Sequence, residues 1–163
     1  MSLVIALGSN IGDKEKNLKE AISYLSKAFG NPISKSNIYC SEPFGEIAQD
    51  DFLNMCIEFM SPKINPIETL HQCLEIEEKM GRVRSIKWGP RVIDIDILYF
   101  DDKAIQSKEL IIPHPHINER SFVVLPLSEL NIFDDLKRKH TYNTKFSTKS
   151  FIYQGPCATK LGQ

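Results

Sequence analysis

The sequence predicts an α+β domain in which helices cover an antiparallel β-sheet. Short apolar runs rich in branched residues alternate with segments of helical period, and Gly, Pro and Asn separate the two kinds of segment. At 163 residues the chain can bury a sizeable core, and its 42% hydrophobic and 25% charged residues are typical of a globular protein. We therefore expect one domain over residues 1–163.

The first two elements are a strand and a helix. Residues 3–7 form an apolar run that predicts a buried strand, and the turn-forming residues 8–13 end it. From Asp13 on, apolar residues recur at helical spacing: Leu18, Ala21, Ile22, Leu25, Ala28 and Phe29. Asp13 is placed to cap this helix, and Gly30 ends it.

Two more strands and a second helix follow. Residues 33–40 form a weakly patterned strand. Residues 52–60 form the clearest strand of the chain, with one face made by Leu53, Met55, Ile57 and Phe59. Residues 65–68 combine a capping Asn, a proline at the first helical position and a capping-box acid, so they open a helix. Its apolar stripe is Ile67, Leu70 and Leu74, and it ends at Gly81.

The order of the elements predicts the fold. Residues 92–100 are a β-rich run, which gives the order strand, helix, strand, strand, helix, strand. This βαββαβ order is that of a ferredoxin-like fold, an antiparallel sheet with both helices on one face. We then expect an edge hairpin over 101–112 and an apolar stretch over 121–130 that Pro126 interrupts. Within the C-terminal extension, residues 131–163, the last 28 residues from Leu136 show little periodicity, and we expect a partly ordered tail.

Charge and cysteine content exclude several classes of protein. Lys and Arg number 20 and Asp and Glu 21, so the basic surplus of a nucleic-acid-wrapping protein is absent. No apolar run approaches the roughly 20 residues that span a bilayer, and residues 1–7 lack the features of a signal peptide. The four cysteines form no C-x-x-C pair, and Cys56 and Cys73 lie in apolar segments as small hydrophobes. We expect a cytoplasmic protein with no nucleic-acid or membrane partner.

Asp94 and Asp96 are the sharpest chemical feature of the sequence. Residues two apart on a strand point to the same face, so these carboxylates lie side by side while Ile93, Ile95 and Ile97 face the core. Paired hard oxygen ligands suit Mg²⁺, which favours carboxylates together with substrate phosphates. On spacing alone, a solvated polar strand face explains the pair equally well.

The segment before this pair is rich in cations. Residues 79–91 contain no acid and five cations: Lys79, Arg82, Arg84, Lys87 and Arg91. Guanidinium groups match phosphate oxygens in bidentate geometry. A charged surface connection explains the segment taken alone, but beside a carboxylate pair it predicts a phosphoryl-transfer site.

Two further groups are candidates for ligand contacts. Two aromatic faces and one amide could hold a planar heterocycle, and the candidates are Phe44, Phe52, Asn54 and Phe122. Their periodicity by itself fits ordinary core aromatics. His114 follows the carboxylate strand and could reach a phosphate.

Several motifs together resemble the 6-hydroxymethyl-7,8-dihydropterin pyrophosphokinase family of folate biosynthesis. The resemblance covers roughly residues 2–130, and the motifs that carry it are ALGSNIGD at 6–13, SEPFG at 41–45, QDDFLN at 49–54, GRVR at 81–84, WGPRVIDIDI at 88–97, PHP at 113–115 and RSFV at 120–123. This resemblance implies a ferredoxin-like fold, in agreement with the element order. It also implies pyrophosphate transfer from ATP to the hydroxymethyl group of the pterin, with release of AMP.

The resemblance assigns roles to the phosphate-binding side. Asp94 and Asp96 would hold two Mg²⁺ ions on the triphosphate of ATP, and Arg82 and Arg91 would stabilise the transferring group. The other residues expected to contact ATP are Arg84, Trp88 on the cationic segment, Ile97 at the adenine, His114 and Arg120.

The resemblance likewise assigns a pterin-binding side. Phe52 and Phe122 would stack on the two faces of the pterin, and Asn54 would hydrogen-bond its amide edge. Backbone and shape contacts would come from Ser41, Pro43, Phe44 and Gly45. We expect a monomer, and the extension after residue 130 receives no role.

Two other classes of function remain open at this point. A ferredoxin-like sheet can be an RNA-binding or regulatory module, for which a salt-sensitive RNA shift would be the sign. The D-x-D pair could also serve a kinase or a nucleotidyltransferase. The released product distinguishes these enzymes: AMP for pyrophosphoryl transfer, ADP for a kinase and pyrophosphate for nucleotidyl transfer.

Overall fold

The structure is a computed structural model that describes residues 1–43, 48–83, 89–147 and 149–155. Its main sheet has the strand order β5-β1-β4-β3-β8, with β2 also paired to β4. The strands are β1 (Ser2–Ser9), β2 (Ser34–Lys35), β3 (Tyr39–Ser41), β4 (Phe52–Met60), β5 (Asp94–Phe100) and β8 (Ser150–Ile152). Every pairing in it is antiparallel, as the ferredoxin-like prediction requires.

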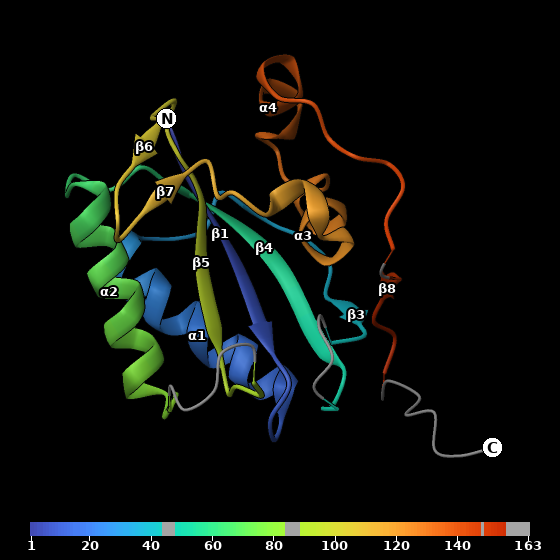
Figure 1. The fold of residues 1–163 in the computed structure, drawn as a ribbon. Helices are drawn as coiled ribbons and strands as arrows, with labels where there is room; N and C mark the ends of the chain where they lie inside the picture. The colour runs from blue at the N-terminus through green and yellow to red at the C-terminus, as the bar shows by residue number, and fades with distance from the viewer. Residues whose placement is uncertain (44–47, 84–88, 148, 156–163) are drawn as a thin grey trace.

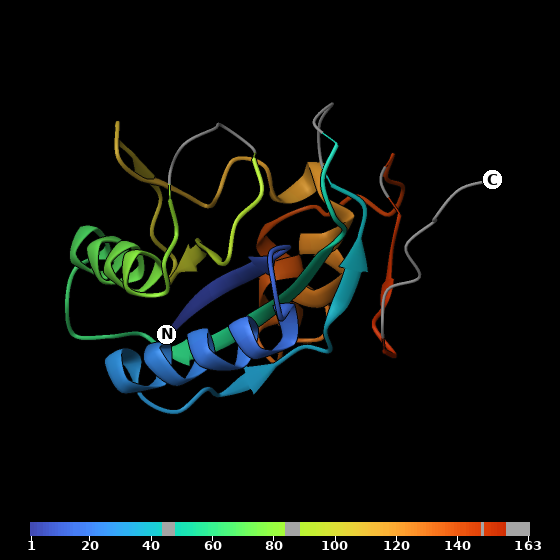
Figure 2. The same cartoon turned by 90° about the horizontal axis from the view of Figure 1, so that it is seen from below.

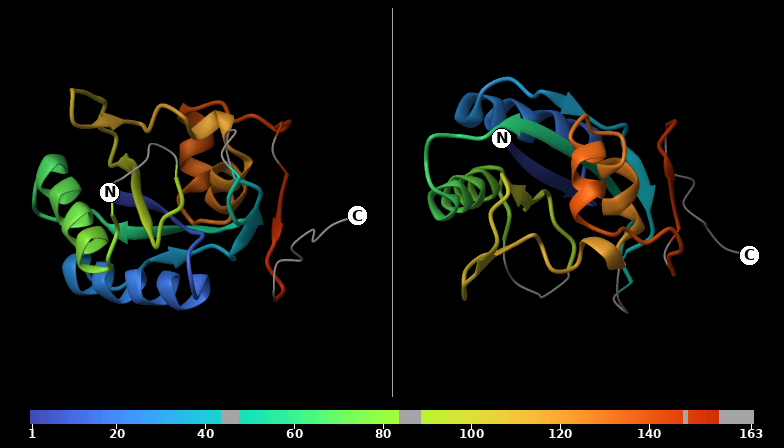
Figure 3. Two further views of the ribbon diagram at one scale, coloured as in Figure 1. Left: turned by 60° about the horizontal axis from the view of Figure 1, so that its bottom comes forward. Right: turned by 90° about the horizontal axis from the view of Figure 1, so that it is seen from above.

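Helices cover both faces of this sheet. Helices α1 (Lys14–Phe29) and α2 (Pro66–Lys79) lie on one face, and α3 (Ser121–Leu127) and α4 (Phe133–Lys139) lie on the other (Figure 1, Figure 3). Alternate residues of each strand therefore enter two different cores. Leu3, Ile5 and Leu7 pack with α1 and α2, whereas Val4 packs with α3.

Local sequence signals explain where the first two helices begin and end. The Asp13 carboxylate accepts a hydrogen bond from the backbone N–H of Lys16 at 3.0 Å, which caps α1 as predicted. Asn65 and Glu68 form the predicted capping box at the start of α2. The Cys56 and Cys73 side chains are buried and free, as expected of small hydrophobes.

The structure differs from the expected elements in three places. The predicted strand over 33–40 is split into β2 and β3. The hairpin over 101–112 forms as β6 (Ile105–Gln106) and β7 (Ile111–Ile112), but in a separate two-stranded sheet. The stretch over 121–130 contains helix α3, in which Pro126, one residue before the end, removes only its own backbone donor. The extension contains α4 and β8 among its described residues, which agrees with the expected partly ordered tail.

The most buried stripe of α2 also differs from the predicted one. Thr69, Cys73, Ile76 and Glu77 are buried, and Ile67, Leu70 and Leu74 are half-buried at the edge of that contact. Tertiary docking of the helix decided which side turns fully inward. In the part of the chain that the structure describes, no helix combines the length and apolar character needed to cross a membrane.

Candidate active site

The floor of the candidate site is formed by three adjacent strands. Gly8 of β1 pairs with Asn54 of β4 on one side and with Asp94 of β5 on the other. Ala6, two residues earlier, pairs with Asp96. Because successive side chains alternate, all of these positions lie on the face opposite α1 and α2. The strand register thus places a carboxylate pair beside a buried amide.

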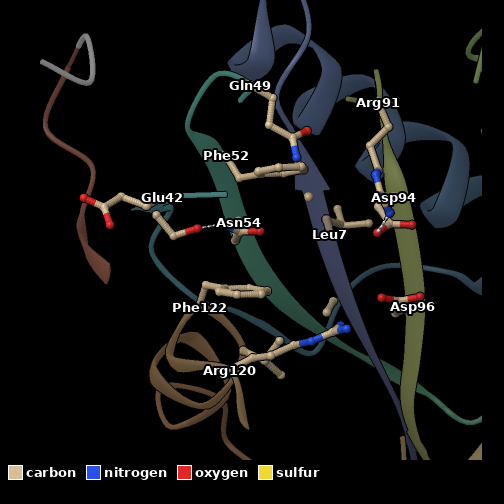
Figure 4. A pocket seen from close by; sticks show the side chains of 14 residues that line it. Leu7, Glu42, Gln49, Phe52, Asn54, Arg91, Asp94, Asp96, Arg120 and Phe122 are labelled. Atoms are coloured by element: carbon tan, nitrogen blue, oxygen red, sulfur yellow. Dashed lines mark hydrogen bonds and ion pairs between the residues drawn. The ribbon is translucent and has the colours of Figure 1, made fainter. Parts of the chain in front are cut away.

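A pocket opens above this floor (Figure 4). Helix α3 supplies one wall, and the segments before β4 and β5 supply another. Residues predicted from the sequence that line it are Ser41, Phe52, Asn54, Arg91, Asp94, Asp96, Arg120 and Phe122. They are joined by Ala6, Leu7, Gly8, Glu42, Gln49 and Val123.

On one side of the pocket, guanidinium groups hold a carboxylate. Asp94 Oδ1 pairs with Arg82 Nη1 at 2.5 Å, and Asp94 Oδ2 pairs with Arg91 Nη1 at 2.7 Å. Both arginine side chains are about 15% exposed, so these pairs are shielded from bulk water. Arg91 is therefore fixed within reach of any anion that enters the pocket, and Arg82 holds the same carboxylate from an adjacent groove.

Asp96 has a different environment. Within the described ranges its carboxylate makes no hydrogen bond, although it faces the pocket beside Asp94 (Figure 4). Burial, followed by the neighbouring charge of Asp94, raises the pKa of Asp96 to about 7, even though Arg120 and Arg82 act in the opposite direction. A bound cation would reverse this effect and hold the carboxylate ionised.

This carboxylate pair fits a Mg²⁺ site that is completed by a substrate. Among the described residues no group of three or more His, Cys, Asp or Glu side chains could enclose a metal ion. Mg²⁺ is usually bound through one or two carboxylates, with substrate phosphates and water as the other ligands. Asp94 and Asp96 match that donor set, and Asp96 has oxygen lone pairs that no described hydrogen bond uses.

The other side of the pocket is aromatic. Phe52 and Phe122 lie on opposite sides of the space in front of Asn54 (Figure 4). The Asn54 side chain is buried, and its Nδ2 donates to Ser41 Oγ at 2.9 Å, which fixes the orientation of the amide. Guanidinium groups flank both rings, with Arg91 6.0 Å from the Phe52 centroid and Arg120 5.9 Å from the Phe122 centroid. The arrangement suits a flat heterocycle with an amide edge.

Gly8 keeps this aromatic side open. A Cβ at Gly8 would lie 3.1 Å from Asn54 Oδ1 and 3.7 Å from Phe52 Cδ1. We expect Gly8→Ala to weaken binding of the pterin that the sequence predicts about tenfold, because the added methyl group pushes the Asn54 amide out of place. Calorimetric titration with the pterin measures this. Gly12→Ala is the control: it strains a φ of +67° but meets nothing within 4 Å, so it should lower stability without changing pterin affinity.

Two residues outside the predicted site set organise the site. Glu77 is 2% exposed; its Oε1 accepts from the backbone N–H of Ile95 at 2.8 Å and also pairs with Arg82. The signal was available, since Glu77 lies four residues after Cys73 and hence on the buried side of α2. Asn10, treated as a turn residue, accepts from the backbone N–H of Arg91 at 2.8 Å and donates to Gln49 at 3.0 Å.

Some predicted residues lie elsewhere. Arg82 borders an adjacent groove beneath α2 while it holds Asp94. The Ile97 side chain is 3% exposed in the core under α1 and α2, so only its backbone is available for a nucleotide. Pro43 and His114 do not line the pocket. Phe44, Gly45, Arg84 and Trp88 lie outside the described residues.

His114 predicts a pH dependence of stability. Burial, then the positive charges of Arg120 and His116, lower the pKa of His114 to about 4, although Asp94 and Glu119 oppose the shift. The unfolded chain takes up this proton near pH 6.5, so stability is complete above that pH and falls between pH 6.5 and 4. When the pH drops from about 7.5 to 5, we expect the free energy of unfolding of His114→Gln to fall by about 2 kcal/mol less than that of the wild type. Urea unfolding at the two pH values measures this, and equal losses would contradict it.

The chain is similar to known proteins. The family profile described as 7,8-dihydro-6-hydroxymethylpterin-pyrophosphokinase (HPPK) matches residues 4–132. The chain is 44% identical over 127 residues to the 2-amino-4-hydroxy-6-hydroxymethyldihydropteridine pyrophosphokinase of Bacillus subtilis. The aligned region covers 77% of this chain and 75% of the relative. The chain is 40% identical to the protein of that name from Methylorubrum extorquens, over 77% of this chain and 80% of the relative.

Solved structures show the same fold. A Plasmodium falciparum HPPK-DHPS chain, crystallised with pteroate, superposes with a TM-score of 0.61 at 17% identity. The superposition covers 78% of this chain but only 38% of that longer chain. At 17% identity this similarity establishes the fold, and the chemistry has to be argued from the residues of the site.

Proposed function

Because the chain belongs to the 7,8-dihydro-6-hydroxymethylpterin-pyrophosphokinase family, we propose that it transfers pyrophosphate from ATP to 6-hydroxymethyl-7,8-dihydropterin. The acceptor is the hydroxymethyl oxygen, and AMP is the second product. The reaction belongs to folate biosynthesis. We further propose that the protein acts as a cytoplasmic monomer.

One observation carries this proposal: a single pocket joins a phosphate-binding half to a heterocycle-binding half. Asp94 and Arg91 line it on one side, and Phe52, Asn54 and Phe122 line it on the other. A pterin between the two rings would direct its hydroxymethyl group toward the carboxylates and guanidinium groups. The two reactants are thereby brought to one place, which removes much of the entropic cost of a two-substrate reaction.

The chain's own residues mainly position the two substrates and neutralise charge on the phosphates. Asn54, held by Ser41, orients the amide edge of the pterin. Arg91 faces the polyphosphate, and Arg82 holds Asp94 beside it. Asp94 and Asp96 would hold Mg²⁺, for which we propose two ions that neutralise phosphate charge and orient the triphosphate. The hydroxymethyl oxygen forms a bond to the β-phosphorus, and the bond from that phosphorus to the α-phosphate oxygen breaks. No described side chain is assigned as the base, and the hydroxyl proton passes to solvent.

Chromatography of the reaction with ATP and the hydroxymethyl pterin tests this function. We expect AMP and the pterin pyrophosphate in equal amounts, formed only when Mg²⁺ is supplied. Release of ADP would instead indicate a kinase, and release of pyrophosphate a nucleotidyltransferase. Either result would contradict the proposal.

A further inference from the structure

The C-terminal extension returns to the edge of the pocket. The family profile ends at residue 132, yet the chain continues through α4 and adds β8 as the last strand of the main sheet, next to β3 (Figure 2). In this pairing Ser41 lies opposite Ser150, and Tyr39 lies opposite Ile152. The strand therefore contacts the element that supplies the Ser41 hydroxyl to the pocket.

Ser150 joins two elements that carry pocket residues. It pairs with Ser41 on β3, and its Oγ lies 2.7 Å from the Oγ of Ser121. Ser121 is the first residue of α3 and stands immediately before Phe122. Ser41 and Ser121 are both buried, at 1% and 2% exposure, so small changes in their spacing displace neighbouring side chains.

Tyr153, the residue immediately after β8, also binds neighbouring elements. The backbone N–H of Tyr153 donates to the Ile38 carbonyl at 2.8 Å, and its hydroxyl donates to Glu15 Oε1 on α1 at 2.8 Å. Phe151 and Ile152, in contrast, are 57% and 46% exposed, so their side chains contribute little apolar burial. Backbone pairing and a few polar contacts thus hold β8, whose contacts lie on β3 and α3, while Tyr153 immediately after it contacts α1.

We propose that β8 is a positioning element for the pterin half of the pocket, in which Ser150 sets the distance between β3 and the start of α3. This inference rests on the proposed function, because it takes the pterin as the occupant of that half. Ser41 orients Asn54, and Phe122 supplies one stacking face. Fixing both from outside the pocket preorganises it and lowers the cost of ordering it around the ligand.

Two substitutions at one exposed position test the proposal in the full-length protein. Phe151→Pro removes a backbone donor from the strand, whereas Phe151→Thr removes the same ring and preserves the strand. We expect Phe151→Pro to raise the Kd for the pterin about three- to tenfold while the Kd for Mg·ATP and kcat at saturation stay within about twofold. Phe151→Thr should match the wild type.

Ser150→Ala should raise the pterin Kd about two- to threefold without disturbing the backbone.

The results separate this inference from the function beneath it. If wild-type protein binds no pterin, the proposed function fails. If the wild type binds the pterin but Phe151→Pro and Ser150→Ala bind it equally well, β8 has no positioning role. The inference is also wrong if pterin and ATP affinities fall together, because that pattern means a general loss of structure.

Discussion

Replacement of Asp96 by Asn is expected to reduce AMP release about a thousandfold or more while the protein keeps its fold. Asp96 faces the pocket and has no hydrogen bond among the described residues, so the folded protein gains little from its charge. Burial beside Asp94 in fact opposes that charge. A carboxylate kept under these conditions is best explained by a cation that binds it together with substrate phosphates.

Stability is the second measurement on this variant. Without Mg²⁺, the melting temperature of Asp96→Asn should equal or exceed that of the wild type, since one of two adjacent like charges is gone. Asp94→Asn is the matched control, because it weakens the ion pairs with Arg82 and Arg91 and should lower the melting temperature. Normal AMP release from Asp96→Asn would refute the metal assignment. A fall in its melting temperature would mean that Asp96 has a structural role.

Replacement of Arg91 by Ala is expected to lower kcat about a hundredfold or more and to change pterin affinity less than about fivefold. The guanidinium is fixed by Asp94 at 2.7 Å and by the Gly89 carbonyl at 3.2 Å, so it needs little reorganisation to meet charge that develops on the transferring group. Its distance of 6.0 Å from the Phe52 centroid accounts for the modest effect on pterin binding.

The comparison of kinetic constants decides the role of Arg91. Arg91→Lys keeps the charge but loses the planar fork, so its kcat should fall between those of the wild type and Arg91→Ala. Rapid-quench turnover and equilibrium pterin titration give the two quantities for each variant. Equal losses in kcat and in pterin affinity would show that Arg91 contributes only to ground-state binding.

Local sequence patterns determined α1, α2, β1, β4 and β5 and the face on which each residue of these strands lies. The alternation in β5 put Asp94 and Asp96 on the pocket side and Ile95 and Ile97 in the core. The alternation in β4 put Asn54 on the pocket side as well. Capping residues set where α1 and α2 begin. These features depend on neighbours a few residues away, which is why a single sequence reveals them.

Tertiary structure alone decided which of these side chains meet. Gly8 lies between Asn54 and Asp94 because three strands, distant in sequence, are hydrogen-bonded in one particular register. Docking of α2 placed the inward-facing Glu77 against the backbone of β5, and the return of the chain after α4 placed Ser150 opposite Ser41. Register and docking minimise the free energy of the whole fold, through packing and buried hydrogen bonds between remote segments. No local pattern encodes them, and the shape of the pocket follows from them.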